Sequence, residues 1–305
     1  MHINDFLLKL SHKAVKKNIL PMSLLRVQVK NKQERIFNKI KYYFDHEIKD
    51  TTDFEKTSDN VKIIWVLWYQ GLNCAPDVVK SCIASIIKQN PDYKVIVLTD
   101  DNVWNFYNAP SYVKDKVLSG IITKTHFSDI LRFYLLKTYG GVWIDSTVYM
   151  TKPLLPWFSI HPFATLKDNG TNVDLLSISE GKWSGYIISS AKGGYLVTML
   201  NSFFERYWEK EERLVDYFLI DYAIKFLYLN FQSIREVINL GAIDGSNRFF
   251  LAKNINNPYT DEIRYLISTD ELGMYKLNYK FEFHLLDKFG CKTIYKNILD
   301  DSIIR

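Results

Sequence analysis

The stretch Thr125–Pro153, THFSDILRFYLLKTYGGVWIDSTVYMTKP, decides the fold of this chain. Its first half predicts a helix that either Thr125 or Ser128 caps, and the pair of glycines that follows ends this helix, as glycines commonly do at a helix C-terminus. Apolar residues lie on nearly every side of the helix, which indicates a buried element. A short apolar strand, Val142–Ile144, follows at once and carries Asp145 at its carboxyl end.

An acid and a base lie within the apolar part of this helix. Asp129 and Arg132 are three residues apart and therefore share one face. A buried ion pair is seldom present for stability alone, because the desolvation of the two charges offsets their attraction. Ligands of open α/β sheets bind beyond the carboxyl ends of the strands, which is where Asp145 is expected. The sequence therefore predicts that this stretch carries the functional site.

Two more strands are predicted upstream. Val61–Tyr69 is a continuous apolar run, typical of a central parallel strand, and a helix begins near Pro76. A second strand, Tyr93–Leu98, ends at Thr99. Strand, helix and strand within about forty residues predict a right-handed βαβ unit. Together with Asp145, the order is β-α-β-α-β, with a hydroxyl or acid after the second and third strands.

Later elements are less distinct in the sequence. We expect a strand over Trp183–Ser190, a helix from the glycines at 193 and 194 to Trp208, and a buried helix over Val215–Leu229. Asp221 in the last helix either faces a ligand as a hydrogen-bonding group, or acts as a cap or pairs with Lys225 four residues on. The residues after 241 are rich in loops and are not assigned.

Composition indicates an ordinary globular protein, with 47% hydrophobic and 24% charged residues among 305. The aromatic content of 15% has two explanations, a carbohydrate or nucleoside site or an AT-rich genome. Lys9 breaks the first apolar run, so no signal peptide is expected, and no run approaches the roughly 18 apolar residues of a membrane-spanning helix. Three cysteines without zinc spacing fit a reducing compartment. We expect a cytoplasmic protein, soluble or peripheral.

The N-terminal residues 1–55 predict a helical arm, broken at Pro21, ahead of a main domain at 56–305. Between Lys9 and Lys41 the one acid is Glu34, against a set of bases, namely Lys9, Lys13, Lys16, Lys17, Arg26, Lys30, Lys32, Arg35, Lys39 and Lys41. The arm either binds an anionic membrane at the inner face of the plasma membrane or packs on the domain. Nucleic acid is not expected as a partner, because nothing else in the chain resembles a nucleic-acid module.

Three segments in order, KIIWVLWYQG, VIVLTDDN and FSDILRFYLLKTYGGVWID, resemble a known family. It is the GT-A glycosyltransferases of the DXD-sugar-binding (GT32-like) group, especially bacterial capsular polysaccharide synthesis proteins. The resemblance covers residues 61–153 and extends more loosely to GYIISSAKGGYL and KLNYK. It implies a GT-A-like, Rossmann-like α/β fold with a mostly parallel sheet flanked by helices and α-rich C-terminal additions.

The resemblance also implies an activity. It points to a retaining hexosyltransferase that moves galactose or glucose from a UDP-sugar to a lipid-linked saccharide acceptor, in the synthesis of capsule or surface polysaccharide. Two alternatives stay open from the sequence. A sugar-phosphate transferase shares the donor pocket but releases UMP, and a non-catalytic nucleotide-sugar-binding protein would explain an altered metal motif.

Site residues follow from the resemblance. Trp68 is implied to stack on the uracil and ribose, with Trp65 as the other available ring. Asp129 is implied to bind sugar hydroxyls and Arg132 to steady that carboxylate or the sugar, and these two with Asp145 form the predicted catalytic group. The predicted donor-binding set is Val66, Trp68, Tyr69, Thr99, Ser128, Asp129, Arg132, Gly141, Trp143, Asp145 and Lys280.

The Asp-x-Asp metal motif of the family is altered here to Asp145-Ser146-Thr147. Mn²⁺ or Mg²⁺ prefers oxygen ligands that include carboxylates, so a weakened metal site is expected. Its predicted ligands are Asp145, Thr147 and His284, with Asp287 as another candidate for the last place. Lys276 and Lys280 are candidates to neutralise the diphosphate that leaves.

Overall fold

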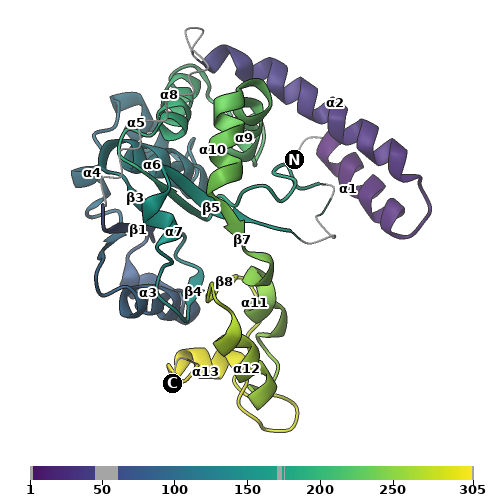
Figure 1. Ribbon diagram of the computed structural model, residues 1–305. Coiled ribbons are helices and arrows are strands. Elements are labelled where there is room, and N and C mark those ends of the chain that lie inside the picture. Colours follow the sequence, from purple (N-terminus) through teal and green to yellow (C-terminus); the bar gives the residue numbers. More distant parts are fainter. Residues whose placement is uncertain (1–2, 45–60, 170–173, 175, 304–305) are drawn as a thin grey trace.

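A computed structural model describes residues 3–44, 61–169, 174 and 176–303 of the chain (Figure 1). A six-stranded sheet lies at the centre, with helices on both faces, and two hydrophobic clusters occupy its opposite faces. The strand order is β2-β1-β3-β6-β5-β7, in which β1 pairs in parallel with β2 and β3, and β5 with β7. The α/β class with a mostly parallel sheet, predicted from the sequence, is confirmed.

Several predicted site residues lie just after the carboxyl ends of the strands. The six strands of the main sheet are β1 (Ile63–Leu67), β2 (Lys94–Leu98), β3 (Gly141–Ile144), β5 (Phe163–Lys167), β6 (Ile187–Ser190) and β7 (Ala242–Asp244). A second, two-stranded sheet pairs β4 (Val148–Met150) with β8 (Met274–Lys276). Strand β1 ends before its predicted end, so Trp68 and Tyr69 follow its carboxyl end. Strand β2 ends at Leu98 as predicted, and Thr99 follows it.

The predicted βαβ unit is present. Helix α3 (Asp77–Gln89) joins the parallel neighbours β1 and β2. Side chains of these strands alternate between the two clusters, so that Trp65 and Trp143 lie on one face and Ile64 and Val142 on the other. Strand β3 is buried along its whole length, as expected of a central strand covered on both faces.

Helices cover the two faces unequally (Figure 1). One face, which contains the larger cluster, packs against α2 (Met22–Ile40), α4 (Val103–Phe106), α5 (Ser111–Leu118), α6 (Lys124–Tyr139), α8 (Tyr195–Lys210), α9 (Leu219–Asn230) and α10 (Gln232–Gly241). The other face packs against α3, α7 (Trp157–Ile160), α11 (Phe250–Asn254), α12 (Asp261–Thr269) and α13 (Ile294–Leu299). Short 3-10 turns occur at η1 (Lys41–Tyr43), η2 (Leu72–Cys74) and η3 (Ser246–Phe249).

The connection from α6 to β3 follows the sequence closely, with one correction at its start. The cap of α6 is Thr123, not Thr125 or Ser128, because the extended backbone at Thr123 lets its side chain accept from the amide of His126. Gly140 and Gly141 have φ of 73° and 95°. A Cβ at Gly141 would lie 2.5 Å from the carbonyl oxygen of Ile63, so only glycine fits this close approach of β3 to β1.

Two predicted elements are shorter than the sequence indicated. The strand expected from Trp183 begins only at Ile187, since the hydroxyl of Thr165 bonds both the amide and the carbonyl of Ser184 and holds the preceding backbone in a turn. The helix expected from Val215 begins at Leu219, because the carboxylate of Asp216 accepts from the amide of Phe218 and holds a turn there.

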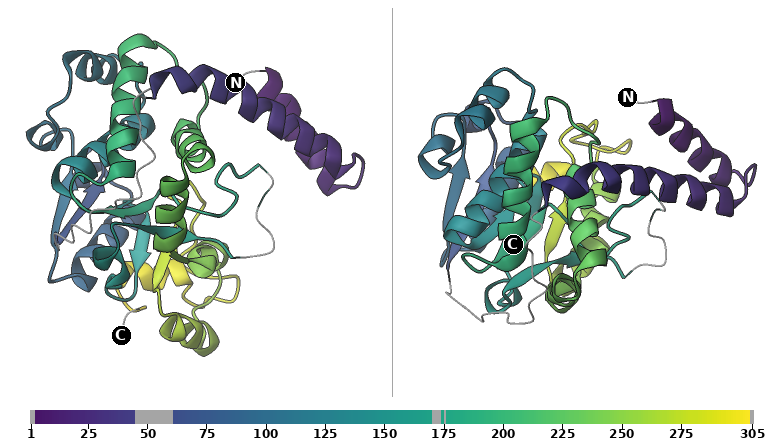
Figure 2. Two further views of the ribbon diagram at one scale, coloured as in Figure 1. Left: turned by 45° about the horizontal axis from the view of Figure 1, so that its top comes forward. Right: turned by 90° about the horizontal axis from the view of Figure 1, so that it is seen from above.

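The N-terminal residues form a helical hairpin, in which α1 (Ile3–Lys16) and α2 lie on either side of Pro21. The hairpin projects from the body, as the views in Figure 2 show, while the end of α2 is anchored. The ring of Phe44 stacks between Phe203 and Phe226, at centroid distances of 4.5 and 4.7 Å. The predicted boundary at residue 55 lies outside the described residues. Within the described part of the chain, no helix is long and apolar enough to cross a membrane.

Candidate functional site

A tight turn after β3 forms the centre of the site. The amide of Val148 donates to the carbonyl of Asp145 at 3.0 Å, so the chain reverses between β3 and β4 and brings the side chains of Asp145 and Thr147 to the same place. The amide of Asp145 donates to the carbonyl of Tyr186 on the neighbouring strand connection, at 2.9 Å. The altered metal motif therefore lies on a fixed turn at the carboxyl end of β3, as predicted.

Arg132 connects the helix α6 to this turn. Its guanidinium lies 3.4 Å from the carboxylate of Asp129 and 3.4 Å from that of Asp145. The guanidinium also lies over the ring of Trp143, at 5.0 Å, and the indole nitrogen of Trp143 donates to Asp145 at 2.9 Å. The structure thus brings the predicted catalytic group into one cluster and adds Trp143 to it, while their roles stay predictions.

The space around Arg132 depends on a glycine. A Cβ at Gly185 would lie 3.3 Å from Nη1 of Arg132, which is closer than nearly all such contacts. Only 5% of the side chain of Arg132 is exposed, and its Nε is buried without a hydrogen-bond partner within the described residues. A buried donor without a partner is costly, so this nitrogen is available to a ligand that enters the site.

Lys276 is the residue whose position the sequence did not reveal. Strand β8 pairs with β4 so that Lys276 lies opposite Val148, next to the turn. Its ammonium donates to Oδ2 of Asp145 at 2.6 Å and to Oγ1 of Thr147 at 2.7 Å. It also lies 5.2 Å from the ring centre of Tyr186. The sequence named Lys276 only as a candidate near the diphosphate, because the pairing of β4 with β8 has no local signal.

A third carboxylate approaches the same cluster from α9. The indole nitrogen of Trp183 donates to Asp221 at 2.9 Å. Burial raises the pKa of Asp221, and the bond from Trp183 and the charge of Arg132 offset part of that rise. The predicted pairing of Asp221 with Lys225 is wrong, because Lys225 binds Glu180 instead, at 2.7 Å. Trp183 is the side chain that holds Asp221 in place.

Burial and charge separate the acids of the cluster. Burial raises the pKa of Asp129 to about 7, against the lowering effect of Arg132 and with the help of Asp221 and Asp145. Burial also raises the pKa of Asp145, but Lys276 and Arg132 outweigh it and hold that pKa below its usual range. Asp145 is therefore ionised at neutral pH, whereas Asp129 titrates near neutrality.

This difference predicts a pH dependence of stability that Asp129 causes. Its pKa of about 7 in the folded protein lies above the unfolded value of 3.8, so its contribution is complete below about pH 4 and is lost as the pH rises to about 7. Across that window we expect Asp129 to lower the free energy of unfolding by about 1.4 kcal/mol per pH unit. Urea unfolding of the wild type and Asp129→Asn at pH 5 and pH 7 measures this slope, and equal slopes would remove the assignment.

The predicted donor-binding residues at the ends of β1 and β2 lie at the same edge of the sheet. Trp68 is half-buried, and its indole nitrogen is buried without a hydrogen-bond partner among the described residues, whereas Trp65 lies in the core and donates to Gly140. Tyr69 is half-buried beside Lys124, and the amide of Thr99 is bound by Asn102. Trp68 is therefore the better placed of the two candidate rings.

The other predicted residues are divided between the core and the surface. Val66 is fully buried within β1, and Ser128 is half-buried on α6. Gly141 begins β3, so the length of that strand separates it from Asp145, and its contact with Ile63 gives it a packing role. Lys280 is exposed on the segment after β8, next to Tyr279, whose ring lies 5.3 Å from that of Trp68.

The residues at the turn do not fit a Mn²⁺ or Mg²⁺ site. Within the described ranges, the turn has one carboxylate, that of Asp145, and the ammonium of Lys276 already donates to its Oδ2 and to the hydroxyl of Thr147. His284 is exposed on a loop that Asn256 and Thr293 hold. Among the described residues, no group of three or more His, Cys, Asp or Glu is arranged to hold a metal. The metal requirement predicted from the motif thus stays a prediction that the donor set does not favour.

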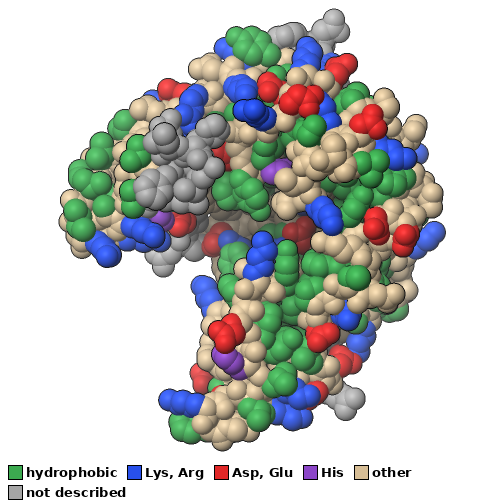
Figure 3. Space-filling model, turned by 180° about the vertical axis from the view of Figure 1, so that it is seen from behind, with side chains coloured by type: hydrophobic (Ala, Val, Ile, Leu, Met, Phe, Trp, Pro, Cys, Tyr) green, Lys and Arg blue, Asp and Glu red, His purple; other side chains and the backbone are tan. Residues whose placement is uncertain are grey.

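The site opens to the surface on one side of the molecule. From behind, the space-filling view shows a hollow between the upper body and the C-terminal part, where acidic and basic side chains lie close together (Figure 3). The side chains of Asp145 and Lys276 are 27% and 21% exposed, against 5% for Arg132. A ligand therefore reaches Asp145 and Lys276 first.

An α/β domain with charged side chains at the carboxyl ends of its parallel strands has the form of a nucleotide-binding protein. Residues 16–298 match the model of the capsular polysaccharide synthesis protein family, and the chain belongs to that family. The resemblance of the three sequence segments to capsular polysaccharide synthesis proteins is thereby confirmed, whereas the GT32-like group stays a prediction.

Individual relatives are more distant. The O-glycosyltransferase braB of Annulohypoxylon truncatum is 24% identical over 165 residues, which make up 50% of this chain and 38% of that protein. The match thus spans well under two thirds of that relative's length. The solved structure of PaToxG Glycosyltransferase is similar with a TM-score of 0.37 and 16% identity, over 71% of this chain and 84% of that chain.

Proposed function

We propose that the protein transfers a hexose, galactose or glucose, from a UDP-sugar to a saccharide acceptor, with retention of configuration. The observation that carries the proposal is the cluster of Asp129, Arg132 and Asp145 at the carboxyl ends of parallel strands, beside Trp68. Membership of the capsular polysaccharide synthesis family and similarity to an O-glycosyltransferase support it.

The reaction breaks the bond between the anomeric carbon of the sugar and the β-phosphate oxygen, and the electron pair leaves with UDP. A hydroxyl oxygen of the acceptor forms the new bond, and its proton is released. Positive charge near the diphosphate favours this departure. Lys276 and Arg132 supply that charge, and Asp129, with a pKa of about 7, both donates to and accepts from sugar hydroxyls near neutral pH.

For the acceptor we propose a saccharide linked to a lipid, presented at an anionic membrane surface. The tip of the N-terminal hairpin supports this, since Ile19, Met22 and Leu24 are 69%, 44% and 42% exposed there. Exposed Lys17 and Arg26 flank these apolar side chains. Apolar residues that enter the interface beside bases that meet anionic head groups are the combination that peripheral membrane proteins use.

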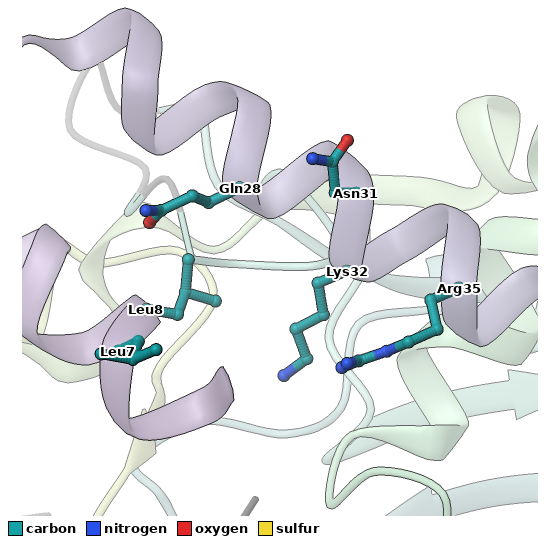
Figure 4. Close-up of a pocket in the computed structure, with 6 residues that line it drawn as sticks. All are labelled: Leu7, Leu8, Gln28, Asn31, Lys32 and Arg35. Carbon is teal, nitrogen blue, oxygen red and sulfur yellow. The ribbon is translucent and has the colours of Figure 1, made fainter. Parts of the chain in front are cut away.

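A cavity between the two helices of the hairpin also supports a lipid-linked acceptor. It has a volume of about 310 Å³ and is lined by Leu7, Leu8, Gln28, Asn31, Lys32 and Arg35. The two leucines reach toward it from α1, and the two basic side chains from α2 (Figure 4). Lys32 is also bound to Asp216 of the main domain at 2.7 Å. A lipid with an anionic head group suits one apolar and one basic wall.

The proposal is tested by turnover of UDP-glucose and UDP-galactose with a lipid-linked saccharide acceptor. We expect UDP and a product that keeps the anomeric configuration of the donor, as read by NMR. Release of UMP would show a sugar-phosphate transferase instead. Tight UDP binding without turnover of either donor would show a non-catalytic binding protein, and both results would overturn the proposal.

The membrane part of the proposal is tested by sedimentation with lipid vesicles. The protein is expected to sediment with anionic vesicles and less with neutral ones, and Ile19→Glu is expected to abolish this sedimentation. The matched control is Ile160→Glu, at a side chain that is 62% exposed on α7, away from the hairpin. Equal sedimentation of Ile19→Glu and the wild type would remove the hairpin from the proposal.

A further inference from the structure

We propose that the ammonium of Lys276 takes the place of a divalent cation in this protein, so that the diphosphate of the donor binds and leaves without a metal. The inference rests on the proposed function, which supplies the nucleotide diphosphate ligand. It assigns a charge-neutralising role to a lysine that donates to the two side chains where the Asp-x-Asp motif would hold a metal.

The first argument is the set of atoms that Lys276 binds. It donates to Oδ2 of Asp145 at 2.6 Å and to Oγ1 of Thr147 at 2.7 Å, which are the two oxygens of the altered motif. A metal at the turn would need the same oxygens. To enter, it would have to displace the ammonium from both and then remain beside it, and like charges at such separations repel.

The second argument is the charge. Asp145 has two carboxylate oxygens, and both are in use: Arg132 and the indole of Trp143 approach Oδ1, while Lys276 binds Oδ2. Two fixed cations thus meet at one carboxylate. The missing second carboxylate of the motif fits this arrangement, because a monovalent ammonium needs less counter-charge than a divalent ion, and the neutral hydroxyl of Thr147 is enough.

The third argument is that the ammonium is still able to bind a ligand. An ammonium has three N–H donors, and two of them are used on Asp145 and Thr147. The third has no acceptor in the part of the chain that the structure describes. The side chain of Lys276 is 21% exposed and is held in direction by β8, which pairs with β4. A phosphate oxygen is a suitable acceptor for this remaining N–H.

The fourth argument is the path of the chain after Lys276. The next three residues lead to Tyr279, whose ring contacts Trp68 at the end of β1, edge to face at 5.3 Å. The segment from Lys276 to Tyr279 therefore contacts Asp145 at one end and Trp68 at the other. A nucleotide whose base lies at Trp68 has its diphosphate on the side of Lys276, which matches the order of the parts of a nucleotide sugar.

The inference is tested by calorimetric titration of the full chain with UDP, in EDTA and in Mn²⁺ or Mg²⁺. We expect the wild type to bind equally in all three buffers. Lys276→Met is expected to weaken UDP binding by about 10- to 100-fold, the usual value of a hydrogen bond to a charged group. Lys288→Met, at an exposed lysine of the same C-terminal segment, is the matched control and is expected to bind like the wild type.

A second variant restores the metal motif. In the double variant Thr147→Asp with Lys276→Ala, the turn has two carboxylates and no ammonium between them, and we expect UDP binding to be lost in EDTA and regained in Mn²⁺. Thermal unfolding of each variant shows that it is folded. Where Lys276→Met is too unstable, Thr147→Val retains the lysine, removes one of its partners, and is expected to bind UDP without a metal but more weakly.

The outcomes separate this inference from the proposed function. UDP binding by the wild type that requires Mn²⁺ or Mg²⁺ overturns the inference and leaves the transferase proposal intact. Unchanged binding by folded Lys276→Met overturns it as well. Failure of the wild type to bind any nucleoside diphosphate, with or without metal, overturns both.

Discussion

Replacing Arg132 with methionine is expected to lower the free energy of unfolding by about 3–5 kcal/mol, the cost of breaking a buried ion pair by removing one partner. The guanidinium is the cation that Asp129 and Asp145 share, at 3.4 Å from each, and only 5% of its side chain is exposed. Without it, the buried Asp129 loses the effect that opposes the rise of its pKa. Urea unfolding at neutral pH measures the loss.

The chain contains a matched control for this substitution. Arg264 and Asp261 on α12 are also three residues apart, with a similar distance of 3.5 Å, but their side chains are 58% and 97% exposed. Arg264→Met is expected to change stability by less than about 1 kcal/mol, because water screens such pairs. The double variant Arg132→Met with Asp129→Asn should regain part of the loss. Equal costs for Arg132→Met and Arg264→Met would contradict the proposed importance of burial.

Substitution of Asp145 by asparagine is expected to lower the rate of transfer by about 100-fold or more, in the range found when a preorganised charge-stabilising group is removed. The asparagine side chain has the same size and keeps one oxygen acceptor, but it has no negative charge to hold Lys276 and Arg132 in place. The fold is expected to persist, since the side chain of Asp145 is partly exposed and the backbone N–H at this position still donates to the carbonyl of Tyr186. Release of UDP from the donor measures the rate.

The control for this experiment is Asp92→Asn, at an exposed carboxylate just before β2, at the opposite edge of the sheet. It is expected to transfer at the rate of the wild type. Wild-type turnover by a folded Asp145→Asn would remove this residue from the site. A loss of unfolding cooperativity in Asp145→Asn would show instead that the turn itself depends on the charge.

The parts of the fold that the sequence predicted share one property, which is that their signals are local. The apolar runs of β1, β2 and β3, the glycines after α6 and the position of Asp145 can each be read within a few residues. The ion pair of Asp129 and Arg132 is also local, since residues three apart on a helix share a face. For this reason the sequence could indicate the side chains that α6 and β3 carry, and the structure places Asp129, Arg132 and Asp145 in one cluster, while their roles stay predictions.

The parts that the sequence did not reveal depend on contacts between distant residues. Lys276 is 131 residues from Asp145, and only the pairing of two three-residue strands brings them together. Such short strands have no periodic pattern to detect. Trp183 and Asp221 meet across 38 residues, and the helical spacing of Asp221 and Lys225 suggested a pair that long-range packing replaces. The metal motif describes neighbours along the chain only, so it gave no sign that Lys276 lies beside Asp145 and Thr147.

The pairing of β4 with β8 forms the site from two distant parts of the chain, the turn after β3 and the segment 242–303. The segment 242–303 contributes one side of it through Lys276, and the strand that delivers this lysine has three residues. A ligand that binds both Lys276 and Arg132 therefore adds a contact between this C-terminal segment and helix α6. By linkage, occupancy of the donor site raises the free energy of local opening of that segment, so a bound donor stabilises the position of residues 242–303.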